Sequence, residues 1–156
     1  AKPGGMAVES AVRALTLLPA DVHLVLLGGN YEPYGELARE LGIGSRVHTP
    51  GSVQPTDVAA AISTADLAPI LYWGATPNLE NCLPNGLFHV LAGGIPVLYP
   101  ELNEITRLVS PLGCGMPIEP RAPESIAHAV TEFRRDAELR VHLTSAARAA
   151  ASEVLC

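Results

Sequence analysis

The stretch NCLPNGLFHVLAGGIPVLYP, residues 81–100, carries the signals for a helix followed by a buried strand. The helix is expected from about Asn85 to Ala92, and Pro84 stands where a proline suits a helix start. Two glycines follow the helix, and the apolar run IPVLYP then predicts a strand. The stretch is therefore one helix–strand unit, and the fold depends on whether such units repeat.

The same alternation continues on both sides of this stretch. The run VHLVLLGG, residues 22–29, is apolar on both faces, which predicts a strand covered by helices on both sides. Further strands are expected in RVHTPG, DLAPIL and CGMPIEP. Further helices are expected in MAVESAVRALTLL (ended by Pro19), YGELARELGI, PTDVAAAISTA (with Thr56 as N-cap), PESIAHAVTEFR and an Ala-rich segment from Asp136. This order predicts an α/β fold with a doubly wound parallel sheet and right-handed crossovers.

Composition limits the classes of protein and partner. With 156 residues, 48% hydrophobic and 17% charged, the chain can build one ordinary core, so we expect a single domain over residues 1–156. The net charge of −6 argues against a general affinity for nucleic acid or anionic lipid. The three cysteines form no C-x-x-C pair and suggest neither a disulfide framework nor a zinc site. A cytoplasmic location fits best.

The two ends of the sequence suggest an excised piece of a larger protein. The chain opens on a turn and a helix, and it stops within or just after a helix. We therefore expect that a first strand and a closing C-terminal helix are missing. Apolar surface at the cut ends could make the piece associate with itself.

A ligand site is expected where the strands end and loops lead into helices. The loop from Tyr72 to Pro84 precedes the helix at Asn85, whose free N–H groups would suit a phosphate. Asn81 and His89 could face the same ligand and hydrogen-bond a ribose. The plainer alternatives stay open: Pro84 and Asn85 simply cap a helix, and His89 is an ordinary core or surface residue.

The segment LPNGLFHVLAGGIPVL resembles the C-terminal domain of the retaining GT-B glycosyltransferases of group 1. LPADVHLVLLGG, RVHTPGSVQPTDVAAAISTADLAPIL and LGCGMPIEPRAPESIAHAV extend the resemblance over nearly the whole chain. The resemblance implies a Rossmann-like half of a GT-B fold that binds a nucleotide diphosphate sugar, without a metal ion. A missing N-terminal domain would bind the acceptor.

The resemblance also implies a donor site, at positions where this chain departs from the family. Asn81 and His89 stand where the family has two Glu residues that contact the sugar and the ribose, and Gly86 stands where many relatives have Lys. Pro84 and Asn85 match the family's Pro-Asn pair. The family's nucleotide also lies near the turns that hold Gly28, Gly51 and Val53 here. No catalytic residue is assigned.

Two other hypotheses remain open at this point. The departures at Asn81, Gly86 and His89 would also fit a non-catalytic module that has lost donor binding and serves a structural or partner-binding role. A sugar-nucleotide epimerase half shares the fold. The donor base, the donor sugar and the acceptor are not predicted, and a parent enzyme could dock peripherally on a membrane.

Overall fold

The computed structural model describes residues 6–74 and 76–155. Its strands are β1 (Leu24–Leu27), β2 (Val47–Gly51), β3 (Ala68–Pro69), β4 (Val97–Pro100) and β5 (Gly115–Ile118). All pairing between these strands is parallel, with Leu24 opposite Val47 and Val97 opposite Gly115. The predicted α/β class with parallel strands is confirmed.

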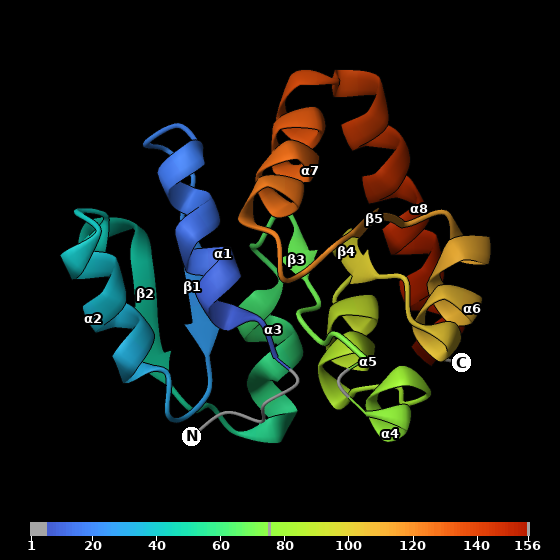
Figure 1. Ribbon diagram of the computed structural model, residues 1–156. Helices are drawn as coiled ribbons and strands as arrows, with labels where there is room; N and C mark the ends of the chain where they lie inside the picture. The colour runs from blue at the N-terminus through green and yellow to red at the C-terminus, as the bar shows by residue number, and fades with distance from the viewer. Residues whose placement is uncertain (1–5, 75, 156) are drawn as a thin grey trace.

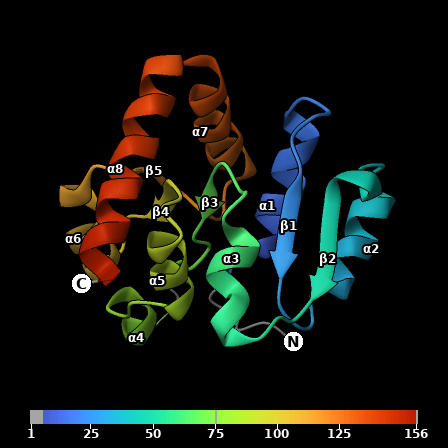
Figure 2. The ribbon, with the colours of Figure 1, turned by 180° about the vertical axis from the view of Figure 1, so that it is seen from behind.

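The strands form two sheets, β1–β2 and β3–β4–β5. Within the described ranges, no strand pairing joins β1 to β3, and the two sheets lie side by side with α1 and α3 on opposite sides of the space between them (Figures 1 and 2). The single continuous sheet that the alternation suggests is therefore divided at this point.

The helices are α1 (Val8–Ala14), α2 (Glu32–Glu40), α3 (Val58–Ile62), α4 (Pro77–Glu80), α5 (Asn85–Ala92), α6 (Asn103–Leu112), α7 (Pro123–Arg135) and α8 (Ala137–Leu155). The expected bounds of α5 are confirmed. The short helix α4, within the loop expected from Tyr72 to Pro84, is not predicted by the sequence. None of the helices in the described ranges is long and apolar enough to cross a lipid bilayer.

Thr56 was expected to cap α3, and this prediction is wrong. The residue lies inside a 3-10 turn, Pro55–Asp57, and Asp57 occupies the N-cap position without a side-chain hydrogen bond. Because Pro55 starts the turn one residue earlier, Thr56 already belongs to the turn and is not the extended residue that an N-cap requires. The helix that follows is only five residues long.

Helices cover the two sheets unequally. Helices α1, α2 and α7 lie on one face, and α3, α5 and α8 on the other (Figures 1 and 2). Seen from behind, β1 and β2 have no helix across them (Figure 2). Val25 on β1 is 59% exposed, while Leu26 is buried against the α1 side. The prediction that VHLVLLGG is covered on both sides is therefore wrong, because the short α3 packs against α5 instead.

The buried side chains form two clusters that meet at β4. Leu98 belongs to the cluster with α1 and α7, whereas Val97 and Tyr99 belong to the cluster with α5, α6 and α8. Successive side chains of a strand point to opposite faces, so β4 is packed from both sides. This buried central strand positions the loops at its carboxyl end.

Candidate functional site at the carboxyl edge of the three-stranded sheet

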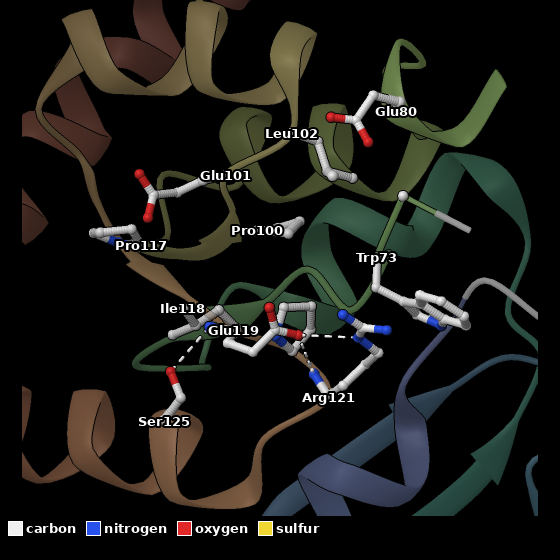
Figure 3. Close-up of a pocket in the computed structure, with 12 residues that line it drawn as sticks. Trp73, Glu80, Pro100, Glu101, Leu102, Pro117, Ile118, Glu119, Arg121 and Ser125 are labelled. Carbon is white, nitrogen blue, oxygen red and sulfur yellow. Dashed lines mark hydrogen bonds and ion pairs between the residues drawn. The ribbon is translucent and has the colours of Figure 1, made fainter. Parts of the chain in front are cut away.

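A cleft of about 430 Å³ lies where β4 and β5 end, beside the loop that follows β3. Parallel strands end at the same edge, which is where open α/β sheets bind ligands. The cleft's lining comes from the loop after β3, helix α4, the loop before α6, and the loop between β5 and α7 (Figure 3). The cleft lies at the sheet edge chosen from the sequence, and part of the expected loop lines it, but the predicted binding residues do not.

Arg121 and Trp73 form one wall of this cleft. The Arg121 guanidinium carbon lies 4.6 Å from the centre of the Trp73 ring, and the two side chains lie together in Figure 3. Arg121 Nε also donates to Glu119 Oε1 at 3.2 Å, and the Arg121 backbone N–H donates to the same oxygen at 3.1 Å. These contacts fix the guanidinium in a half-exposed position, where a cation–π contact contributes about 0.5–1 kcal/mol.

The loop after β5 is held in place by its own helix. The Ser125 Oγ accepts a 2.9 Å hydrogen bond from the Glu119 backbone N–H, which ties the strand end to the first turn of α7. This contact therefore positions both Glu119 and Arg121 at the rim of the cleft.

The charges around the cleft favour hydroxyl groups over phosphates. Among the residues that the structure describes, its lining contains Glu80, Glu101 and Glu119 and one basic side chain, Arg121. Ionised carboxylates only accept hydrogen bonds, so they suit the hydroxyl groups of a sugar and repel an anion. The single arginine is partly neutralised by Glu119.

A second cleft of about 440 Å³ shares this wall. It lies beside the start of α1 and the first half of α2, and Trp73 and Arg121 line it as well. The Arg121 guanidinium therefore lies between the two clefts.

Tyr72 does not line either cleft, although it precedes Trp73. Its ring packs against the cluster around α5, and burial raises the pKa of the phenol above its usual value of 10.0. Trp73 lines the cleft, whereas Tyr72 packs onto the core.

The turn after β1 and the end of β2 bring two predicted residues together. The Gly28 N–H donates to the Gly51 carbonyl at 2.9 Å. Both glycines have positive φ angles, 134° and 96°, which side chains rarely adopt. Val53 follows in the next loop and is partly exposed. These three residues lie at the carboxyl ends of the two-stranded sheet.

The other predicted residues surround α5. Asn81 is exposed; its Nδ2 donates to the Pro77 carbonyl at 2.9 Å, and its Oδ1 accepts from Asn103 at 3.1 Å. Its amide therefore joins α4 to the start of α6. Pro84 is buried at the N-cap position of α5, and no side chain caps this helix start.

Asn85, Gly86 and His89 lie along α5 itself. Asn85 and Gly86 are exposed, and a Cβ added at Gly86 would meet nothing within 4 Å. His89 is half-buried in the last turn, where its carbonyl accepts the Gly93 N–H. None of the eight predicted residues lines either of the two clefts. Their role in donor binding stays a prediction.

Sequence reasoning missed Glu101, Glu119 and Arg121. Glu101 and Arg121 directly follow predicted strands, and Glu119 lies near the end of one, so the rule that selected the loop after β3 could have selected them too. Arg121 and Trp73 are 48 positions apart in sequence (121 − 73), and no local pattern indicates that they meet.

Residues 7–150 match the sequence model of the family described as Glycosyl transferases group 1. The chain belongs to this family. A search of curated protein sequences finds no significant match to this group 1 glycosyltransferase chain.

Solved structures share its fold. WaaG, a glycosyltransferase involved in lipopolysaccharide biosynthesis, is 23% identical, with a TM-score of 0.77 over 96% of this chain and 40% of that one. Anabaena Alr3699/HepE in complex with UDP is 19% identical, with a TM-score of 0.79 over 98% of this chain and 43% of that one. The group 1 chain thus has the Rossmann-like fold of a GT-B half, and it spans less than half the length of these structures.

Proposed function

We propose that this chain is the donor-binding domain of a group 1 glycosyltransferase and binds a nucleotide diphosphate sugar at the carboxyl edge of its sheets. The cleft at the ends of β4 and β5, in a chain of this family, is the observation that carries the proposal. The similar HepE was solved in complex with UDP and with UDP-glucose, which supports a nucleotide sugar as the ligand class.

The cleft's chemistry assigns roles to its residues under this proposal. Glu101 and Glu80 accept hydrogen bonds from the sugar hydroxyls, while Arg121 attracts the diphosphate. The uncapped start of α5 lies outside the cleft lining and attracts a diphosphate that extends beyond the cleft. The acceptor binds to another domain of the parent enzyme, and the sugar is transferred with retention of configuration. The transfer itself uses no metal ion or other cofactor, because helix ends and basic groups stabilise the leaving diphosphate.

A calorimetric titration of this chain with UDP, GDP, ADP and UDP-glucose tests the proposal. Saturable binding of one nucleotide, weakened in His89→Ala, is expected if the imidazole contacts the ribose. Gly86→Lys is expected to tighten binding, because open space surrounds Gly86 and the new cation would meet the diphosphate. Gly86→Gln is the matched control. The absence of binding to every nucleotide would contradict the proposal.

One observation favours a second candidate function. The three carboxylates of the cleft outnumber its one arginine, and Arg121 is already paired with Glu119. A non-catalytic module that has lost donor binding, with a structural or partner-binding role, would tolerate this balance. Failure of Gly86→Lys to create binding where the unmodified chain shows none would favour this candidate.

The proposal extends to the cellular setting. We expect the parent enzyme to work in the cytoplasm, where nucleotide sugars are the donors, with or without peripheral docking on a membrane. The open edges of β1 and β3 could also pair this chain with a second copy. Sedimentation at several protein concentrations would measure such self-association.

A further inference from the structure

The open face of the two-stranded sheet carries two histidines in direct contact. His23 immediately precedes β1, and His48 lies on β2. Both are exposed, and His23 Nδ1 lies 2.9 Å from His48 Nε2. The parallel register places His48 opposite Val25, so the strand pairing itself holds the two rings together. Neither histidine has a part in the proposed donor site, which lies at the opposite ends of these strands.

The two rings meet edge to edge. Their planes are within 11° of each other and their centres are 5.2 Å apart. Stacked faces would keep all ring atoms at van der Waals distance, whereas the two nitrogens are 2.9 Å apart. Each ring therefore points one nitrogen at the other, and the pair shares one hydrogen between an N–H and a lone pair.

We propose that His23 and His48 form a binding site for a divalent late transition metal ion, with Cu²⁺ bound most tightly and Zn²⁺ and Ni²⁺ less tightly. Imidazole nitrogen is a preferred ligand of these ions, and their affinities follow this general order. The ion takes the place of the shared hydrogen. That hydrogen moves to the other nitrogen of the same ring. Both facing nitrogens then present lone pairs to the ion, and the pair loses no proton.

The observed separation suits two neighbouring ligands of one ion. Metal–nitrogen bonds of about 2.0–2.1 Å at angles between square and tetrahedral place the two nitrogens about 2.9–3.4 Å apart. The 2.9 Å distance lies at the lower end of this range. Because both rings are exposed, each can tilt so that its lone pair points at an ion beside the line that joins the nitrogens.

The surroundings limit the site to two protein ligands. In the described part of the chain, no group of three or more His, Cys, Asp or Glu side chains could hold a metal ion, so water completes the coordination. Asp21 is bound to Arg134 at 2.8 Å. The Arg46 guanidinium donates to the Val22 carbonyl at 3.0 Å and adds a nearby positive charge. The site is therefore expected to bind moderately, and the proposal is independent of the donor site.

Calorimetric titration of this chain with CuCl₂ and ZnCl₂ tests the site, with His23→Gln and His48→Gln as variants and His128→Gln as control. Glutamine can still hydrogen-bond its neighbour but is a poor ligand for these ions. His128 is exposed on α7. Loss of one of two linked ligands should weaken binding on the order of 10²-fold in each variant, and the control should bind like the unmodified chain.

A second readout identifies the ligating atoms. Nitrogen-15 NMR of the histidine rings is expected to show Zn²⁺-dependent shifts at His23 Nδ1 and His48 Nε2. Mg²⁺, which prefers oxygen ligands, should cause none. The proposal is overturned if no saturable Cu²⁺ or Zn²⁺ binding occurs, or if binding survives both His23→Gln and His48→Gln. Equal weakening in His128→Gln would also overturn it.

Discussion

Every residue of β4 is buried, whereas β1 buries only Leu26 and leaves Val25 exposed. The difference comes from the neighbours of each strand. β4 pairs with a strand on both sides and is packed by both hydrophobic clusters. Within the described residues, β1 pairs only with β2 and has one covered face. The same parallel pairing thus produces a sheet with a fully buried central strand that positions a cleft, and a half-open sheet that exposes Val25 and His48.

The comparison predicts losses of stability of different size for the same truncation on the two strands. Val97→Ala on β4 should lower the free energy of unfolding by about 2–3 kcal/mol, because Val97 is fully buried and its loss leaves a cavity. Val25→Ala on β1 should cost less than about 1 kcal/mol, which is the range of strand propensity at exposed sites. Urea denaturation measures both. Equal losses would show that β1 is covered in solution.

Two glycines sharpen the comparison within the three-stranded half. A Cβ at Gly115 would lie 2.5 Å from the Val97 carbonyl oxygen, so Gly115→Ala must push β5 away from β4 and should cost about 1–3 kcal/mol. Gly86→Ala meets open space in the first turn of α5 and should stabilise the chain by up to about 1 kcal/mol. Thermal unfolding of the two variants should shift in opposite directions, and a loss in both would contradict the account.

The sequence predicted the half of the molecule around the three-stranded sheet better than the half around the two-stranded sheet. The bounds of α5 follow from Pro84 and from the glycines after Ala92, which are local signals. The apolar run at residues 22–29 indicates a strand but does not say which faces have helices over them. The coverage of this strand depends on α3. This helix is short because Pro55 begins a 3-10 turn, and the residues expected to start the helix belong to that turn.

The sequence predicts at which edge of the sheet the candidate site lies, but not which residues line it. The sheet edge follows from strand direction alone, which is why the loop after β3 was expected to matter. The contact between Arg121 and Trp73 and the contact between His23 and His48 depend on how distant segments pack. The spacing of these residues in the sequence does not predict either contact.

A smaller effect is expected at the ion pair that links α7 to the loop before β1. The hydrogen bond from Arg134 holds the pKa of Asp21 below its usual 3.8. A carboxyl whose pKa is lowered by folding stabilises the protein above its unfolded pKa and loses this effect as pH falls through the folded value. Asp21→Asn should therefore be slightly less stable at pH 7, and it should equal the unmodified chain at an acidic pH below the lowered pKa of Asp21.

Chemical denaturation at the two pH values checks this prediction. High salt at pH 7 should reduce the difference, because both side chains are exposed. A difference of the same size at both pH values would mean that Asp21 acts through something other than its charge.

The most direct test of the central claim is to map where a nucleotide sugar binds by amide NMR, using UDP-glucose as the probe. The account predicts saturable shifts in the loops after β3, β4 and β5, including Trp73, Glu101 and Arg121, with the amino ends of β1 and β2 unchanged. No saturable shifts, or shifts confined to the surface around His23 and His48, would contradict a donor site at the carboxyl edge.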